Sequence, residues 1–410
     1  MPTSTARRLL EEIFASKRIQ CAISLTGGGG NVAGDLLGTC GASSTLLELT
    51  LPYYQQSLLN YLNLPADIVK REAPTKFSFS SQEVAMLMAK ESLERARRLV
   101  PLEDAATCVG VGCTAALVSL QPRKGSHRAY VTLHSAHGIH NYKLEMHKGA
   151  RSRKEEDETV GNLIVLALAN AANIDTSHLA TEITSHDDDV LTVEPTTTFD
   201  NSFPDVLTSF ASSIAFLPFH DTLLRDMPWR KMLVVPGSFN PIHDGHVRFA
   251  AAAQRLLHSA TGDTFPPLFE LSIQNADKGT VNVEDIETRV RGIVQDRKQA
   301  AVLTNASLFL DKAALFPSCA FAVGADTAVR LVDLKYYGND PSNLWLALSK
   351  IAAVGCCFVV AGRLVGDMFV SAEAAVAQVP PPFRSMFHAI PEAEFRLDLS
   401  STQLRQQAAL

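Results

Sequence analysis

The sequence predicts an α/β protein of two domains, the second of which is a doubly wound parallel sheet. Its 410 residues exceed what one ordinary hydrophobic core holds, and 46% of them are hydrophobic, as in a globular protein. After residue 226, short apolar strands alternate with helical patterns, which is typical of a parallel sheet with helices on both faces. The pattern predicts domains at 1–190 and 226–410, joined by a more polar linker or lid at 191–225.

Composition narrows the class of protein. A net charge of −6 argues against binding nucleic acid through a basic surface. The seven cysteines lie mostly in apolar runs and form no paired C-x-x-C motif, which favours reduced thiols over zinc ligands or disulfides. No apolar run is long enough to cross a membrane, so we expect no membrane partner and a cytoplasmic location.

Local patterns predict the elements of the N-terminal half. Ser80-Ser81-Gln82-Glu83 is a capping-box pattern, in which hydroxyl and acidic side chains satisfy the free N–H groups of a helix start. Two alternating stretches around Gly138 are typical of a β-hairpin. The expected elements are a helix at 7–16, a strand at 21–25, a helix at 82–98, a strand at 107–112, hairpin strands at 129–133 and 142–146, and a helix at 163–172.

Four histidines in and around this hairpin could suggest a metal site. They are His134, His137, His140 and His147. A hairpin spreads them over two faces and a loop, so we expect no metal held by protein ligands there.

A glycine run at 26–31 follows the first strand and could bring backbone N–H groups around a small anion. Around it, Ser24-Leu25-Thr26-Gly27-Gly28, Gly41-Ala42-Ser43, Leu51-Pro52-Tyr53 and Phe79-Ser80 resemble the C-terminal domain of the competence/damage-inducible protein A (CinA) family, over about residues 19–172. That family includes nicotinamide mononucleotide deamidases. The resemblance implies an α/β CinA-like domain that could form a homo-oligomer. Its candidate site residues are Ser24, Thr26, Gly27, Gly28, Tyr53 and Arg151.

The sequence departs from the CinA pattern at reactive positions. Ile23 and Leu25 replace an acid and a cysteine of the family motif, and Leu58 replaces a lysine. A serine nucleophile needs a neighbouring base to take its proton. We therefore expect a degenerate deamidase domain that binds a ligand, dimerises or supports the second domain.

The C-terminal half alternates strand and helix throughout. The expected elements are strands at 214–217, 232–235, 268–273, 320–323, 356–360 and 395–397, with helices at 247–258, 283–299, 343–353 and 372–377. Ligands of such sheets bind at the carboxyl ends of the strands. Four candidate nucleotide-binding residues follow strands, namely Lys278, Gly324, Asp326 and Arg363.

The strand at 232–235 leads through a glycine turn into a helix. The first turn of a helix has unpaired N–H groups and a partial positive charge, which favour an anion. Here His243 and His246 bracket Gly245, and the stretch Gly237-Ser238-Phe239-Asn240-Pro241-Ile242 precedes them. This H-x-G-H arrangement resembles the signature of the nucleotidylyltransferase superfamily. The whole stretch is most similar to nicotinate or nicotinamide mononucleotide adenylyltransferases, which implies a Rossmann-like domain with Gly237, Ser238, Phe239, Asn240 and Gly245 at the nucleotide.

A second motif lies near the other end of this domain. Leu399-Ser400-Ser401-Thr402-Gln403-Leu404-Arg405 resembles the I-S-S-T-x-I-R motif of the same family. Hydroxyls and N–H groups of Ser400, Ser401 and Thr402, with the guanidinium of Arg405, would suit the β and γ phosphates of a nucleotide.

The two motifs together imply adenylyl transfer from ATP, with Mg²⁺, to nicotinamide or nicotinate mononucleotide, with release of pyrophosphate. His243, His246 and Arg405 would be the catalytic donors. Two alternatives remain open, because phosphate motifs do not read a base or an acceptor. One is a nucleotidylyltransferase that uses CTP or another phosphate acceptor, and the other is a nucleotide-binding regulatory protein without turnover.

Overall fold

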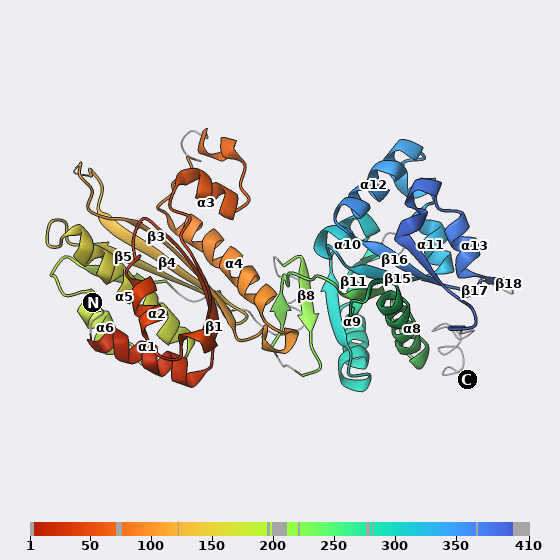
Figure 1. The fold of residues 1–410 in the computed structure, drawn as a ribbon, viewed down its shortest axis with the longest axis horizontal. Coiled ribbons are helices and arrows are strands. Elements are labelled where there is room, and N and C mark those ends of the chain that lie inside the picture. Colours follow the sequence, from red (N-terminus) through yellow and green to blue (C-terminus); the bar gives the residue numbers. More distant parts are fainter. Residues whose placement is uncertain are drawn as a thin grey trace. The chain divides into compact units, whose positions relative to one another are not determined.

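The structure is a computed structural model that describes most of the chain. The described residues are 4–70, 76–121, 123–194, 197–198, 211–219, 222–275, 279–280, 282–365 and 368–396. The chain divides into two compact units, Met1–Phe199 and Asp200–Leu410, and each is built around one sheet (Figure 1). No helix in the described ranges is long and apolar enough to cross a membrane.

The N-terminal unit has a mixed sheet in the order β2-β1-β3-β4-β5-β6, with β7 also paired to β5. Its strands are β1 (Gln20–Thr26), β2 (Leu46–Thr50), β3 (Cys108–Ala116), β4 (His127–Ser135), β5 (Gly138–Met146), β6 (Val190–Val193) and β7 (Thr197–Thr198). The pairs β1–β2 and β1–β3 are parallel, and the pairs from β3 onward are antiparallel. The hairpin predicted around Gly138 is confirmed as β4 and β5.

Helices cover both faces of this sheet. They are α1 (Ser4–Ser16), α2 (Val32–Gly38), α3 (Gln55–Tyr61), α4 (Gln82–Leu99), α5 (Arg153–Ala171) and α6 (Ser177–Ile183). Apolar residues of α1 and α5 form the main core with alternate residues of β1, β3, β4 and β5. On the other face α4 lies against Gly110 and Gly112, where a Cβ atom would come within 2.1 Å of the carbonyl oxygens of Ala89 and Ala85. Glycine is therefore required there for the close approach of α4.

The C-terminal unit has a sheet in the order β19-β16-β15-β10-β11-β14-β8-β9. Its strands are β8 (Ser213–Phe216), β9 (Leu224–Arg225), β10 (Leu233–Pro236), β11 (Pro267–Ser272), β14 (Ala300–Thr304), β15 (Ala320–Gly324), β16 (Cys357–Ala361) and β19 (Phe387–Ile390). From β14 to β19 all neighbours are parallel, whereas β8 and β9 join antiparallel. The strand order reverses between β10 and β15, so the predicted doubly wound sheet is confirmed and its switch point lies there.

Helices lie on both sides of this sheet (Figure 1). They are α8 (Asp244–Thr261), α9 (Val283–Arg291), α10 (Phe309–Leu315), α11 (Ala325–Leu331), α12 (Pro341–Ala353) and α13 (Ala372–Ala377). A π-helical turn, Gly292–Asp296, continues α9. Two short hairpins, β12 (Gln274–Asn275) with β13 (Gly279–Thr280) and β17 (Arg363–Val365) with β18 (Met368–Val370), follow β11 and β16.

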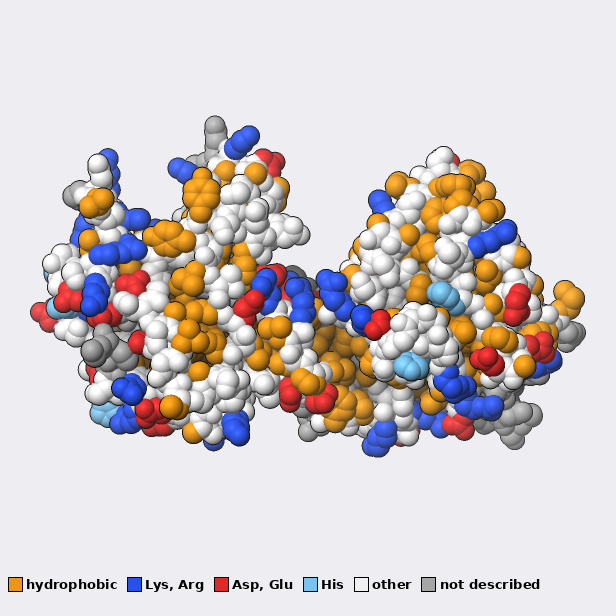
Figure 2. Space-filling view, in the orientation of Figure 1, with side chains coloured by type: hydrophobic (Ala, Val, Ile, Leu, Met, Phe, Trp, Pro, Cys, Tyr) orange, Lys and Arg blue, Asp and Glu red, His pale blue; other side chains and the backbone are white. Residues whose placement is uncertain are grey.

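Several parts of the sequence prediction differ from this structure. The helix predicted at 283–299 is α9 with its π-helical turn and ends by Asp296, and the strand β14 that follows was not predicted. The strand predicted at 395–397 is wrong at residues 395 and 396, which follow β19, the last strand of the described residues; residue 397 lies outside them. Phe395 instead packs its ring 5.5 Å from that of Phe249 on α8. The stretch 191–225, expected as a linker or lid, contributes β6 and β7 to the first sheet and β8 and β9 to the second. On the face that Figure 2 shows, acidic side chains lie among basic ones.

A buried ion pair stabilises the sheet beside the switch point. Lys312 of α10 lies 2.5 Å from Glu270 of β11, and neither side chain is more than 6% exposed. Thr304 donates a hydrogen bond to the same carboxylate, and the Lys312 ammonium also donates to the Ala306 carbonyl. Each charge is thus compensated by the other and by neutral groups, as buried charges require.

Removing one partner of this pair should be costly. Lys312→Met would leave the Glu270 carboxylate buried without a cation, so we expect the free energy of unfolding to fall by about 3–5 kcal/mol. Urea unfolding measures the change. The control Lys350→Met removes an exposed lysine of α12 and should change stability little. The double variant Lys312→Met, Glu270→Leu should recover most of the lost stability, because neither charge remains buried. Equal stability of Lys312→Met and the control Lys350→Met would contradict the account.

Candidate functional site

The turn between β10 and α8 lies at the switch point of the sheet. It begins at Gly237, whose N–H donates to the Glu270 carbonyl at 3.1 Å. A Cβ at Gly237 would come within 2.6 Å of the Phe239 ring, so only glycine leaves room for that ring. Gly245 is buried in the first turn of α8, where N–H groups lack intrahelical partners.

Phe239 fixes the shape of this turn. Its φ of +43° is in the left-handed region, which costs a non-glycine residue about 1–3 kcal/mol. The ring is 1% exposed and packs edge-on against Phe269 at 5.4 Å and His246 at 5.1 Å. Burial of the ring offsets the backbone strain and holds the turn against α8.

The two histidines of the turn are held in one arrangement. The backbone N–H of His243, the N-cap of α8, donates to Nδ1 of His246 at 3.2 Å, and the two rings stack at 3.8 Å. A ring nitrogen that accepts a hydrogen bond carries no proton, so the neutral His246 ring carries its proton on Nε2. His243 is buried, and its Nδ1 has no hydrogen-bond partner within the described structure. The His246 ring therefore presents an N–H at Nε2, whereas Nδ1 of His243 is buried from solvent.

Burial and nearby arginines keep these rings neutral. Burial, followed by the charges of His243, Arg363 and Arg297, lowers the pKa of His246 from its ordinary value of 6.5 to about 3. Burial, followed by the charge of Arg297, also lowers the pKa of His243. Arg297 in turn forms an ion pair with Asp244, the first residue of α8. A neutral histidine ring can still donate one N–H to an anion, and the positive charges beside these two rings are those of arginines.

Three predicted residues meet on the other side of the switch point. Gly324, at the end of β15, is the N-cap of α11, and a Cβ there would lie 2.9 Å from the Asp326 carboxylate. Arg363 of β17 donates to the same carboxylate at 3.2 Å. Because β15 is the parallel neighbour of β10, its carboxyl end with Gly324 lies beside the turn that follows β10.

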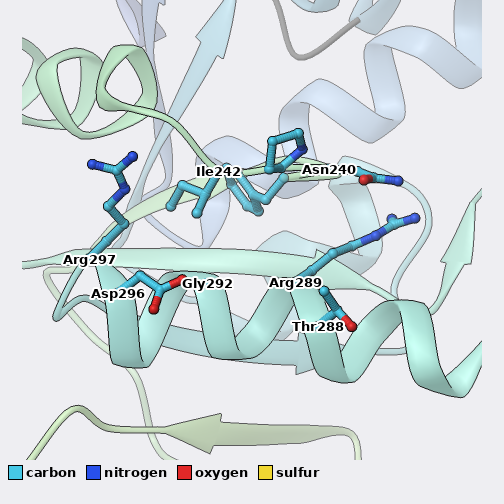
Figure 3. A pocket seen from close by; sticks show the side chains of 9 residues that line it. Asn240, Ile242, Thr288, Arg289, Gly292, Asp296 and Arg297 are labelled. Atoms are coloured by element: carbon cyan, nitrogen blue, oxygen red, sulfur yellow. The ribbon is translucent and has the colours of Figure 1, made fainter. Parts of the chain in front are cut away.

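Two further arginines reach the turn, and the sequence analysis missed them: Arg289 lies on α9, and Arg297 directly follows the π-helical turn. Arg289 donates to the Ser238 carbonyl at 3.2 Å, and Arg297 pairs with Asp244. Between this helix and residues 239–242 lies a cavity of about 250 Å³, with Arg289 and Arg297 toward its two ends and Ile242 between them (Figure 3). Asn240 lines the cavity as well. An arginine in a predicted amphipathic helix usually faces solvent, so the sequence around Arg289 and Arg297 gave no sign of a role at the turn.

Five predicted phosphate-binding residues lie outside the described residues. They are Lys278, Ser400, Ser401, Thr402 and Arg405, and their roles stay predictions. The described site consequently consists of the turn, Asp326 with Arg363, and the two arginines Arg289 and Arg297.

The predicted residues of the N-terminal unit do not form one open site. Ser24 is fully buried and hydrogen-bonded to Ser92 at 2.9 Å, whereas the side chain of Tyr53 is 70% exposed. Arg151 makes a buried ion pair with Asp189 at 2.5 Å. Thr26 is buried at the end of β1.

The glycine run of this unit already surrounds an anion, which is the side chain of Asp157. Its carboxylate accepts hydrogen bonds from the backbone N–H groups of Gly29 at 2.8 Å, Gly30 at 3.2 Å and Asn31 at 2.9 Å. Gly27 and Gly28 pack against Ala115 and Leu117, where a Cβ at either glycine would clash. The predicted anion-binding loop thus binds a carboxylate of α5.

One protein-family model matches the C-terminal unit. Residues 234–407 match the family model described as cytidylyltransferase-like. The C-terminal unit is therefore similar to cytidylyltransferase-like domains over most of its length. Among curated proteins, none matches this chain.

Solved structures similar to this chain include three bacterial proteins. A competence-damaged protein (CinA) superfamily protein of Klebsiella pneumoniae 700603 is 10% identical, with 41% of this chain and 98% of that one covered and a TM-score of 0.32. The competence/damage-inducible protein CihA of Agrobacterium tumefaciens is 16% identical, with 42% and 94% covered and a TM-score of 0.31. An Escherichia coli CinA superfamily protein is 17% identical, with 42% and 90% covered and a TM-score of 0.30. At these scores, conclusions about the N-terminal unit depend on its own residues.

The lowered pKa of His246 predicts a pH dependence of stability. Since the folded state protonates this ring near pH 3 and the unfolded chain near 6.5, the unfolded chain binds the proton first as pH falls. The contribution of the neutral ring is complete above pH 6.5 and is lost toward pH 3, at up to about 1.4 kcal/mol per pH unit. We expect His246→Gln to flatten this loss in urea unfolding, while His258→Gln, at the exposed end of α8, keeps the wild-type slope. Equal slopes in all three proteins would contradict the assignment.

Proposed function

We propose that the C-terminal unit transfers the adenylyl group of ATP to nicotinamide or nicotinate mononucleotide. One observation carries the proposal: a strand, a glycine turn and the N-terminus of an 18-residue helix present two neutral histidines at the switch point of a doubly wound sheet. Such a helix start favours phosphate oxygens. The cytidylyltransferase-like match over residues 234–407 supports nucleotidyl transfer as the class of reaction.

In the proposed reaction a phosphate oxygen of the acceptor attacks the α-phosphorus of ATP. A new P–O bond joins the two nucleotides, and the bond to the β-phosphate breaks, so that pyrophosphate leaves with its electron pair. The protein forms no covalent bond. His246 would donate its Nε2–H to a phosphate oxygen, and Arg297 and Arg363 would supply positive charge as negative charge shifts to the leaving group. Asp326 holds Arg363 in place for that role.

Mg²⁺ would enter this site with the nucleotide. In the described part of the chain, no cluster of three His, Cys, Asp or Glu side chains could hold a metal ion. The donors of the turn are N–H groups, which suit phosphate oxygens and not a bare cation. The ion would bridge phosphate oxygens and neutralise part of their charge, while the turn and the arginines orient them.

The pyridine acceptor and the adenine base rest on the sequence resemblance of residues 237–248. The amide and acid forms of the acceptor both remain in the proposal. CTP is a second candidate donor, and the cytidylyltransferase-like description of the matching family is the observation that favours it. Binding without turnover would instead indicate a regulatory nucleotide-binding protein.

For the N-terminal unit we propose a supporting role without deamidase chemistry. Ser24 is buried against α4, and its hydroxyl contacts Ser92 and the Met88 carbonyl. In the glycine run, three N–H groups bind the carboxylate of Asp157. A nucleophile needs access and a base, and this arrangement offers Ser24 neither among its described contacts.

Pyrophosphate release tests the proposed reaction. Purified protein with Mg²⁺ would be given ATP or CTP, each with nicotinamide mononucleotide, nicotinate mononucleotide or no acceptor. We expect release that requires ATP and a pyridine mononucleotide, and a loss of about a hundredfold or more in His246→Ala, because one transition-state donor is removed.

The matched control is His258→Ala, which removes an exposed histidine from the last turn of the same helix. It should keep wild-type activity. Pyrophosphate release with CTP and an acceptor, but not with ATP, would make CTP the nucleotide donor. Nucleotide binding without release under any condition would overturn the proposed transfer.

A further inference from the structure

The Ser238–Phe239 peptide group is held from one side by α9. Arg289 donates to the Ser238 carbonyl at 3.2 Å, and its own guanidinium is 14% exposed and also contacts Asp285 at 3.4 Å. A trans peptide is planar, with its C=O and N–H pointing in opposite directions. The Phe239 N–H therefore faces away from α9.

No described hydrogen bond uses this N–H. The helix α9 follows β11, which pairs with β10 on one side, whereas β15 with Gly324 and Asp326 pairs on the other side. The Phe239 N–H is turned away from α9, and on that side of the turn no described backbone group accepts a hydrogen bond from it. A phosphate oxygen is a suitable acceptor for such a donor beside a helix start.

The turn has room to move if this contact is lost. The cavity of about 250 Å³ separates residues 239–242 from α9, and two arginine contacts span it, Arg289 to Ser238 and Arg297 to Asp244 (Figure 3). Phe239 holds a strained backbone conformation, so the peptide has a reason to rotate when unpinned.

The geometry points to Arg289 as a positioning residue, which pins the Ser238 carbonyl so that the Phe239 N–H donates to a phosphate oxygen of the bound nucleotide. Arg289 itself touches no ligand in this arrangement. The inference rests on the proposed function for the identity of the anion, and it adds a residue that the sequence motif does not contain. The role differs from that of Arg297, which adds charge beside the histidines.

A spectroscopic test reads this peptide directly. The sequence contains four Ser–Phe pairs, at 78–79, 202–203, 209–210 and 238–239, so protein with ¹³C-carbonyl serine and ¹⁵N-phenylalanine gives at most four linked signals. We expect ATP with Mg²⁺, or pyrophosphate alone, to shift one of them in the wild-type protein. Arg289→Met should abolish that shift, and Arg289→Lys, which can still donate to the carbonyl, should restore part of it.

Arg291→Met is the matched control, because Arg291 lies on the same helix, is 64% exposed and pairs with Glu287. It should behave as wild type. In pyrophosphate release, Arg289→Met should lower kcat about tenfold or more, with KM for ATP within about threefold, because a donor made in the transition state is misaligned. A merely structural role would lower the thermal midpoint and leave kcat of the folded protein unchanged.

The NMR measurement and the pyrophosphate-release measurement together separate this inference from the proposed function. If no acceptor supports turnover but the anion-dependent shift is present in wild type and absent in Arg289→Met, the proposed reaction fails and the positioning role stands. If neither ATP nor pyrophosphate shifts the signal in wild type, or if Arg289→Met shifts as wild type does, the positioning role is overturned.

Discussion

The hydrogen bond from the His243 backbone N–H to Nδ1 of His246 is the constraint on which the C-terminal site depends. It requires a neutral His246 ring, and burial together with nearby positive charge provides that neutrality. It also leaves the ring proton on Nε2, available to a ligand. The strained Phe239, packed on the other side of the ring, keeps the geometry in place. In the proposed function this site would bind phosphate through oriented N–H donors, with arginines as its positive charges.

Sequence reasoning predicted most of this site because its core is local. A strand, a glycine turn and a helix start are neighbours along the chain, so Gly237, His243 and His246 could be placed together without the fold. Alternation of strands and helices likewise predicted the doubly wound sheet. Arg289 and Arg297 could not be predicted, since their contacts with Ser238 and Asp244 join residues more than fifty positions apart. The strand predicted around Phe395 was wrong because this apolar residue packs its ring against Phe249 of α8 and does not pair in the sheet.

In the N-terminal unit, the anion that the glycine run binds comes from a residue far away in the sequence. A glycine run predicts a ring of N–H donors for an anion, and the structure has that ring, but its anion is the Asp157 carboxylate more than 120 residues later. Arg151 similarly pairs with Asp189 in the interior. The first interaction ties α5 to the loop after β1, and the second ties the residues just before α5 to the segment before β6. These contacts favour a supporting unit, in which charged groups of a ligand-binding pattern serve the fold.

The central claim is that the turn at the switch point joins two nucleotides and does not simply hydrolyse one. Phosphorus NMR of ATP, Mg²⁺ and a pyridine mononucleotide incubated with the protein tests it most directly, because every phosphorus atom is observed. The account predicts that the monophosphate and triphosphate signals decline together, while free pyrophosphate and the diphosphate signal of a dinucleotide appear in equal amounts. Unchanged spectra, or ADP with inorganic phosphate as the products, would contradict it.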